Sequence, residues 1–153
     1  MERTKQNVMN LLRELPFFDS FDADDIKAFA PYLSLRQVEE GNTIFQEGDM
    51  GSYLLFIVEG VMEIILTAEN RQQKIVATYG PGASIGEMAL IDEYERSATV
   101  RATTHCEILI LTKTKFDVLQ NENPRVAMKI MKGLARNISL RLRATQGRFR
   151  DII

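Results

Sequence analysis

GPGASIGEMALIDEYERSA occupies residues 80–98 and combines three glycines with Glu87 and Arg96. Gly86 lets the backbone come close to a ligand because it has no Cβ. Residues 87–90 predict one helical turn, whose first N–H groups and partial positive charge suit a phosphate. Arg96 can add a fork of donors to the same phosphate, and Glu87 can accept a hydrogen bond from a sugar hydroxyl. The segment therefore predicts an anion site.

The composition is that of an ordinary globular domain. The chain has 153 residues, of which 45% are hydrophobic and 26% charged, so it can form one core and is not expected to be disordered. The apolar run Tyr53–Val58 is far too short to span a bilayer, and no signal-peptide core follows Met1. We therefore expect a cytoplasmic protein with no membrane segment.

The sequence contains one cysteine and one histidine, so it predicts no intrachain disulfide and no zinc site. Cys106 adjoins an apolar run at 107–111, which indicates a strand and a buried thiol. The acidic stretch Asp22–Asp25 lacks the glycine and the distal glutamate of a calcium loop, so a helix cap is the better interpretation. We expect neither a metal nor a cofactor apart from the bound ligand.

Charge is divided unevenly along the chain. Residues 1–112 hold 9 Lys and Arg against 18 Asp and Glu, whereas residues 113–150 hold 10 against 2. A basic end can attract nucleic acid or an acidic partner. A solvated helix face is the better interpretation, because neither interleaved aromatic residues nor a second DNA-reading helix accompanies the charge. Nucleic acid is therefore not expected as a partner.

The two ends of the chain are predicted to be helical and its middle to be β-structure. Residues 1–33 have apolar residues at helical spacing, and residues 34–112 alternate short apolar runs with glycine turns. From 113 the pattern turns helical again, and from Pro124 apolar residues recur every four positions, which predicts an amphipathic helix of about five or six turns. The expected strands are 43–45, 53–58, 61–66, 74–79, 99–103 and 107–112.

Gly-Glu-x-Ala-Leu at 86–90, followed by Arg-Ser-Ala at 96–98, closely resembles the phosphate-binding cassette of the cyclic nucleotide-binding domain family. Gly41, Gly48 and Gly60 match the run of turn glycines in the β-roll of that family, so the resemblance extends over most of the chain. It implies an α+β fold: an antiparallel, jelly-roll-like β-roll flanked by N-terminal helices and a long C-terminal helix. We expect one domain over 1–153, with helices at 1–33, the roll at 34–112, the cassette at 80–98 and helices at 113–150.

The resemblance also implies which residues contact the ligand. Arg96 would bind the cyclic phosphate, and the family's preference for Thr at position 97 in cGMP binders makes Ser97 favour cAMP over cGMP. The expected cassette contacts are Gly86, Glu87, Met88, Ala89, Arg96, Ser97 and Ala98. The family's roll strands line the base and sugar pocket, and the positions that correspond are Ile64 and Ala77, although both fit equally well as ordinary core residues.

The long C-terminal helix has two interpretations. Its apolar stripe can simply pack on the roll, or, as in family members, it can also cover the purine and pair with a second subunit in a homodimer. Leu142 and Thr145 are the expected lid residues. The register stays open, because Arg141 and Leu142 compete with Thr145 and Gln146 for the positions over the base.

Glu87 and Arg96 also have a purely structural interpretation, in which they form an ion pair with each other or cap a turn. The neighbouring matches favour ligand binding instead. The resulting prediction is a cyclic nucleotide sensor, with cAMP as ligand, in which binding rearranges the C-terminal helix and signals to an unidentified downstream protein. The alternative is a β-roll scaffold that acts through helix pairing without any ligand.

An enzyme is not expected, because one histidine and one cysteine cannot supply the metal cluster or the poised nucleophile of a phosphodiesterase. Family members that are transcription factors continue into a helix-turn-helix module, whereas this sequence ends at Ile153. We therefore expect either a sensor that works alone or one part of a larger system.

Overall fold

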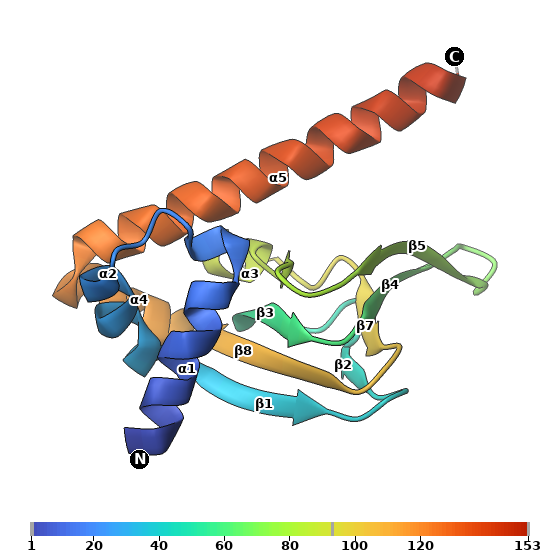
Figure 1. Ribbon diagram of the computed structural model, residues 1–153. Helices are drawn as coiled ribbons and strands as arrows, with labels where there is room; N and C mark the ends of the chain where they lie inside the picture. The colour runs from blue at the N-terminus through green and yellow to red at the C-terminus, as the bar shows by residue number, and fades with distance from the viewer. Residues whose placement is uncertain (1, 93, 153) are drawn as a thin grey trace.

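The computed structural model describes residues 2–92 and 94–152 and confirms the α+β class (Figure 1). Two four-stranded antiparallel sheets form a β-roll, with helices gathered at one end and a long helix, α5, lying across it. The strands are β1 (Ser34–Val38), β2 (Thr43–Phe45), β3 (Tyr53–Glu59), β4 (Met62–Thr67), β5 (Gln73–Tyr79), β6 (Ser84–Ile85), β7 (Thr99–Ala102) and β8 (Cys106–Thr112). The helices are α1 (Glu2–Glu14), α2 (Ala23–Phe29), α3 (Met88–Ile91), α4 (Lys113–Glu122) and α5 (Pro124–Ile152), with 3₁₀ turns η1 (Pro16–Phe18) and η2 (Ala30–Tyr32).

The two sheets place the cassette between them. One sheet has the strand order β1-β8-β3-β6 and the other β2-β7-β4-β5. The cassette contains β6, which pairs with β3, and it leads into β7, which pairs with β2 and β4. Residues 86–98 therefore leave one sheet and enter the other, so both ends of the cassette are anchored to strands. Gly41, Gly48 and Gly60 all adopt positive φ angles at turns of the roll, as the resemblance implies.

The second N-terminal helix, α2, begins at a cap that the sequence predicts. Asp22 accepts a hydrogen bond from the Asp25 amide at 2.8 Å, and the Asp25 carboxylate accepts one from the Asp22 amide at 3.1 Å. This reciprocal pair begins α2 and satisfies amides that the first helical turn leaves without partners. Asp25 is also almost fully buried, and its carboxylate contacts Lys129 at 2.6 Å and Arg125 at 2.7 Å. Because both cations belong to α5, this cluster holds the start of α5 against α2.

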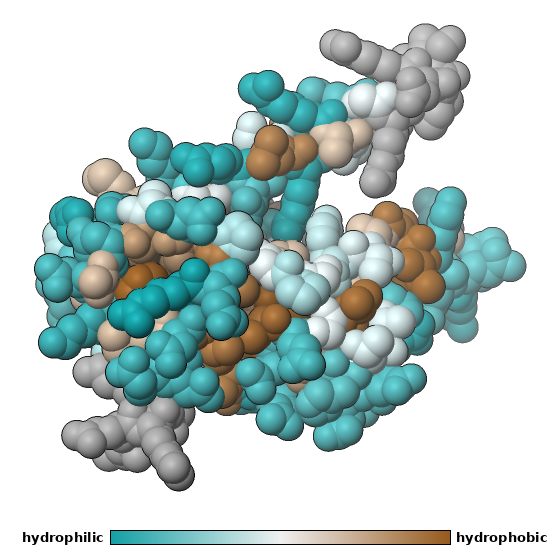
Figure 2. Space-filling model, viewed as in Figure 1, coloured by the Kyte–Doolittle hydropathy of each residue, from teal (hydrophilic) through white to brown (hydrophobic). Residues whose placement is uncertain are grey.

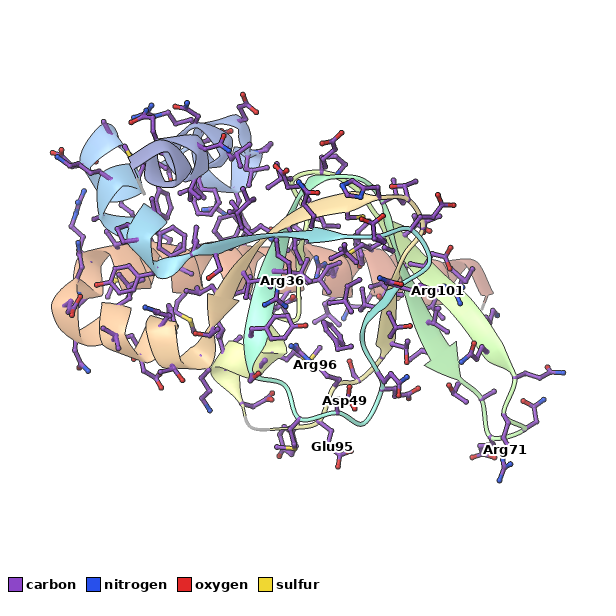
Figure 3. The ribbon with its side chains drawn as sticks, turned by 90° about the horizontal axis from the view of Figure 1, so that it is seen from below. Arg36, Asp49, Arg71, Glu95, Arg96 and Arg101 are labelled. Atoms are coloured by element: carbon purple, nitrogen blue, oxygen red, sulfur yellow. The ribbon has the colours of Figure 1, made fainter. Side chains whose placement is uncertain are left out.

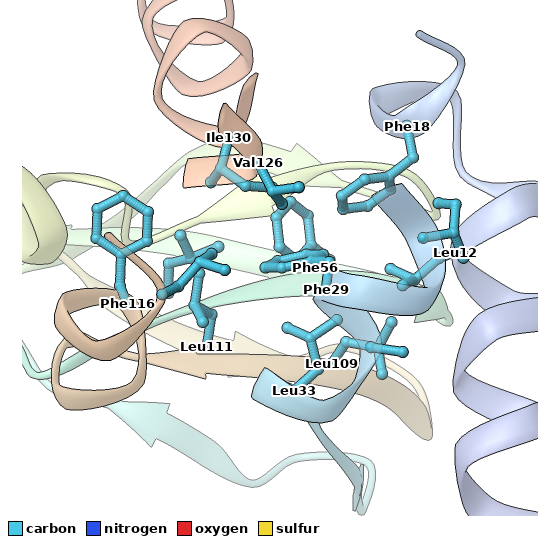
Figure 4. Close-up of a cluster of buried hydrophobic side chains, with 14 of the residues drawn as sticks. Leu12, Phe18, Phe29, Leu33, Phe56, Leu109, Leu111, Phe116, Val126 and Ile130 are labelled. Atoms are coloured by element: carbon cyan, nitrogen blue, oxygen red, sulfur yellow. The ribbon is translucent and has the colours of Figure 1, made fainter. Parts of the chain in front are cut away.

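Apolar side chains form two buried clusters, one on each side of the sheet that contains β3. The first lies between the helices and the roll, and Figure 4 shows Phe18, Phe29 and Phe56 meeting at its centre with Val126 and Ile130 of α5 above them. The second fills the interior of the roll and includes Leu55, Ile57, Val100, Ile108 and Cys106, whose thiol is fully buried. Successive residues of β3 point to opposite faces, which explains why its apolar run contributes to both clusters.

Helix α5 is longer than the sequence predicts. It has 29 residues, which is about eight turns at 3.6 residues per turn, in place of about five or six. The apolar stripe ends at Leu142, but the residues beyond it contain no proline that would end the helix. Figure 1 shows the C-terminal part of α5 extending past the helical end of the molecule and above the roll. None of the helices in the described ranges is long and apolar enough to cross a membrane.

Candidate functional site

A cavity of about 340 Å³ lies between the cassette, the strands of the roll and α5. Most of its wall comes from the cassette and the roll, and the remainder comes from one face of α5. Figure 2 shows the space beneath the outer part of α5, with hydrophobic surface on the helix and on the facing β4–β5 side. The lining residues are Phe45, Ile64, Tyr79, Ile85, Gly86, Glu87, Met88, Ala89, Tyr94, Glu95, Arg96, Ser97, Ala98, Val100, Ile138, Arg141, Leu142 and Thr145.

Gly86 shapes the floor of this cavity. Its φ angle is +86°, a conformation that side chains rarely tolerate, and a Cβ there would lie 2.5 Å from an Arg96 guanidinium nitrogen. The positive φ ends β6 and starts the short helix α3, where the Ala89 amide donates to the Gly86 carbonyl at 3.1 Å. Glycine is required at this position both for the turn and for the space that the guanidinium occupies.

The guanidinium of Arg96 is buried against the roll. It donates to the Tyr53 carbonyl at 2.6 Å and to the Gly86 carbonyl at 3.3 Å, and it lies 3.9 Å from the centre of the Phe45 ring. Arg96 is 7% exposed. Figure 3 places Arg96 beside α3 at the edge of the roll, close to the loop that carries Asp49. Hydrogen bonds between the Asp49 and Arg96 segments hold the backbone from which the Arg96 side chain extends.

The positive charge of Arg96 has no carboxylate within ion-pair distance in the part of the chain that the structure describes. Burial lowers the pKa of this guanidinium from its ordinary value, while the nearby Asp49 and Glu87 carboxylates oppose that shift. Arginine nevertheless stays protonated in proteins. A buried cation that faces a cavity and lacks a carboxylate partner is a strong attractor for a bound anion.

Glu87 faces the same cavity but is bound to α5. One carboxylate oxygen, Oε1, accepts a hydrogen bond from Arg141 Nη1. The other, Oε2, is buried and has no hydrogen-bond partner among the described residues. Glu87 is only 4% exposed. Arg96 is therefore not its ion-pair partner, and the carboxylate retains one buried acceptor without a partner among the described residues.

Arg141 is held by three features of the roll and cassette. Besides Glu87, it donates through Nη2 to the Ser84 carbonyl, and its guanidinium lies 4.6 Å from the centre of the Tyr79 ring. One turn earlier on α5, Asn137 donates to the Ser84 hydroxyl at 3.0 Å. These contacts dock the middle of α5 onto the beginning of the cassette.

Comparison with known proteins identifies the family of the chain. Residues 35–123 match the model of the family described as "Cyclic nucleotide-binding domain". The chain belongs to the cyclic nucleotide-binding domain family. The matched region contains the whole cassette and most of the roll, including both Glu87 and Arg96.

Relatives of this cyclic nucleotide-binding domain occur in larger proteins of different kinds. It is 31% identical over 142 residues to a candidate potassium channel protein of Rhodopseudomonas palustris, covering 90% of this chain and 34% of that protein. It is 32% identical over 123 residues to the cyclic AMP receptor protein of Thermus thermophilus, covering 80% of this chain and 57% of that protein. The chain thus spans only a third to just over half of the length of these relatives.

A solved cyclic nucleotide-binding domain from Methylobacillus flagellatus has the same fold. The two superpose with a TM-score of 0.85 at 24% identity, covering 99% of this chain and 85% of the other. The superposition covers nearly the whole chain and therefore includes α5, which lies outside the residues matched by the family model.

The domain brings together nearly all of the residues that the sequence singles out. Every predicted cassette residue lines the cavity, as do Ile64, Leu142 and Thr145. Ala77 pairs with Ile64 across β4 and β5 but is absent from the lining, where Tyr79, two residues further along the same face of β5, takes its place. The Ala89 amide already donates to Gly86, so it is less open to a ligand than expected.

Each of the two candidate pairs of lid residues contributes to the cavity lining. Arg141, Leu142 and Thr145 line the cavity together with Ile138, whereas Gln146 does not. Residues 138, 141, 142 and 145 lie on one helical face because three and four residues separate them. Sequence reasoning missed Phe45, Tyr79, Ile85, Val100 and Ile138, whose apolar or aromatic character is equally typical of core positions, and Tyr94 and Glu95 of the cassette. In the described ranges no group of three or more His, Cys, Asp or Glu side chains is placed to hold a metal ion.

Proposed function

We propose that this domain binds a 3′,5′-cyclic nucleotide, with cAMP as the preferred ligand, and that α5 transmits the binding event. The observation that carries the proposal is the buried Arg96, which faces the cavity without a carboxylate partner among the described residues. A cyclic phosphate carries one negative charge and presents two oxygens to the forked donors of a guanidinium. Met88 and Ala98 supply the backbone amides that we propose as further phosphate contacts.

Glu87 is the proposed partner of the sugar. Its Oε2 atom is buried, lacks a hydrogen-bond partner in the described part of the chain and belongs to a residue that lines the cavity. A buried acceptor without a partner is unfavourable, and a ribose hydroxyl would satisfy it. Arg96 and Glu87 would thus bind two neighbouring polar groups of one ligand, the cyclic phosphate and the ribose hydroxyl.

The remaining wall suits a purine base. Ile64 and Val100 of the roll, and Ile138 and Leu142 of α5, provide apolar surface on two sides. Leu142 is 57% exposed in this structure, so covering it with a base would bury apolar area that otherwise faces water. Because part of the wall belongs to α5, a ligand that contacts it favours one position of the helix over others.

The wider assignment follows from the same site. We propose a regulatory binding domain extending over 1–153, not an enzyme, that acts in the cytoplasm on an unidentified downstream protein. The cAMP preference draws on Ser97 at the cassette position described above and on the likeness to a cyclic AMP receptor protein. Homodimer formation through α5 stays a prediction.

Titration calorimetry with cAMP, cGMP and adenosine tests the ligand class. We expect saturable binding of cAMP, weaker binding of cGMP and no measurable binding of adenosine, because adenosine lacks the anion that Arg96 requires. A folded-state ligand must also raise the melting temperature. If neither cyclic nucleotide at millimolar concentration shifts the melting temperature, the alternative of a ligand-independent scaffold replaces this proposal.

A further inference from the structure

We infer that Arg141 is a positioning residue for ribose recognition: it holds one oxygen of Glu87 so that the other oxygen accepts the 2′-hydroxyl of the nucleotide. The inference rests on the proposed function and adds a role to a residue outside the cassette. A 3′,5′-cyclic nucleotide has only one free ribose hydroxyl, at the 2′ position. Arg141 therefore acts on one defined atom of the ligand through Glu87.

The two carboxylate oxygens of Glu87 differ in their partners. Oε1 is occupied by Arg141 Nη1, and Oε2 is buried without a hydrogen-bond partner among the described residues. A carboxylate can accept about four hydrogen bonds, two at each oxygen. Binding Arg141 at Oε1 fixes the rotation of the carboxylate plane, so the direction in which Oε2 faces is fixed as well.

A positioning residue must itself be held in place, and Arg141 is held by Ser84 and Tyr79. Its second terminal nitrogen donates to the Ser84 carbonyl, and its guanidinium lies 4.6 Å from the Tyr79 ring centre. The guanidinium is planar, so these contacts at two nitrogens and one face define its position. Ser84 is fully buried and its hydroxyl accepts a hydrogen bond from Asn137, which ties the anchor for Arg141 to the same helix.

The charge of Arg141 also keeps Glu87 in place. Glu87 is 4% exposed, and Arg141 is the only cation within ion-pair distance of it in the described ranges. Removing one partner of a buried ion pair leaves a charge that is poorly compensated. Without Arg141 the carboxylate would turn toward water, and Oε2 would leave the hydroxyl position.

One consequence is a direct link between the sugar and α5. Glu87 belongs to the cassette and Arg141 to α5, so the carboxylate is shared between ligand and helix. If the 2′-hydroxyl orders Glu87 and thereby strengthens its contact with Arg141, then docking of α5 must by linkage strengthen hydroxyl binding by the same factor. A ligand without the hydroxyl would bind the site but lose this part of the coupling.

The test compares cAMP with 2′-deoxy-cAMP on three proteins: the parent chain, Arg141→Gln and Arg143→Gln. Arg143 is an exposed arginine two positions further along α5 that does not line the cavity, so it controls for loss of the same charge on the same helix. The parent should bind cAMP at least about 10-fold more tightly than the deoxy analogue, the usual effect of losing a hydrogen bond to a charged group. Arg141→Gln should lose about 10-fold in affinity for cAMP and less than about twofold for the analogue. Arg143→Gln should leave both affinities within about twofold.

The outcome that overturns the inference is an equal loss for both nucleotides in Arg141→Gln, because this would mean that Arg141 contacts the ligand elsewhere or supports the fold in general. Glu87→Gln provides the second measurement: adding Arg141→Gln to it should cause less than about twofold further loss for cAMP, whereas independent effects would add in full. Should Arg141→Gln unfold, Arg141→Lys retains the charge but not the fork and should show the same selective loss. If the parent chain binds no cyclic nucleotide at all, the proposed function fails and not only the role of Arg141.

Discussion

Glu87 and Arg96 line the same cavity from one short segment, yet each is bound to something other than its neighbour. The Arg96 guanidinium donates to the Tyr53 and Gly86 carbonyls, and the Glu87 carboxylate pairs with Arg141 of α5. Two buried charges of opposite sign thus line one cavity without pairing with each other. Such an arrangement suits a ligand that carries an anionic group and a hydroxyl on the same sugar.

Ser97→Thr should shift the preference of the site toward cGMP. Ser97 is exposed and lines the cavity beside Arg96, so its hydroxyl can reach a base edge. Threonine has fewer rotamers, so its hydroxyl is held more consistently. We expect the ratio of cGMP to cAMP affinity to rise several-fold, or about 0.5–1.5 kcal/mol for one neutral hydrogen bond. Competition titrations check this result, with Ser97→Ala as the control that lacks the hydroxyl, and an unchanged ratio would remove Ser97 from base recognition.

Gly133→Ala should destabilise the fold even though alanine is the better helix former. A Cβ at Gly133 would lie 2.5 Å from the tip of the Phe17 ring, which itself packs on Phe56 with ring centres 5.0 Å apart. Overpacking costs about 1–3 kcal/mol, which outweighs the gain of about 1 kcal/mol in helix propensity. Urea unfolding should therefore show a net loss of stability.

Gly147→Ala is the matched control on the same helix. A Cβ there would meet nothing within 4 Å, so only the helix propensity changes, and stability should stay the same or rise by up to about 1 kcal/mol. If Gly133→Ala were as harmless as Gly147→Ala, the close packing of α5 on η1 would not be needed for the position of the helix.

Asp25 should make stability depend on acid pH. Burial opposes ionisation of this carboxyl, but the hydrogen bonds from Lys129 and the Asp22 amide, together with the nearby charges, hold its pKa below the ordinary value of 3.8. Because the folded-state pKa is the lower one, the stabilisation is fully present above the unfolded-state value and disappears as the pH falls through the folded-state value. Asp25→Asn should cost about 2 kcal/mol at pH 7, less than a fully buried pair because the cations are partly exposed.

The measurement is urea unfolding at pH 7 and at about pH 2.5, where the unfolded-state carboxyl is protonated. The difference between parent and Asp25→Asn should be smaller at the lower pH. Asp24→Asn, an exposed neighbour in the same helix turn, should have little effect at either pH. An equal deficit for Asp25→Asn at both values would mean that packing, not charge, makes this position important.

Much of the architecture could be predicted because local signals and tertiary structure agree. The alternating strands, the cap at Asp22 and the start of α5 at Pro124 all follow from residues adjacent to the elements they define. Strand β1 was not predicted, since Ser34–Val38 is mostly exposed and polar and becomes a strand by pairing with β8. Strand β6 has two residues between glycines and exists because it pairs with β3.

The site was predictable within the cassette and much less so outside it. Gly86, Glu87 and Arg96 stand at fixed spacing in one segment, so a pattern can reveal them. The partner of Glu87 lies 54 residues away along the chain on α5, and the packing of that helix on the roll brings Arg141 to it. The structure also rejects the expected alternative of a Glu87–Arg96 ion pair, which spacing along the chain could not decide.

The most direct test of the account is calorimetric titration of cAMP into the parent chain, Arg96→Ala and Arg101→Ala. Arg101 pairs with Glu63 at 2.8 Å on the outer part of the roll and lies outside the cavity lining, so it controls for loss of an arginine. Arg96→Ala should lower cAMP affinity by about 10- to 150-fold while its circular dichroism spectrum stays that of the parent, and Arg101→Ala should bind like the parent. Unchanged affinity in a folded Arg96→Ala protein would contradict the assignment of this cavity to a cyclic nucleotide.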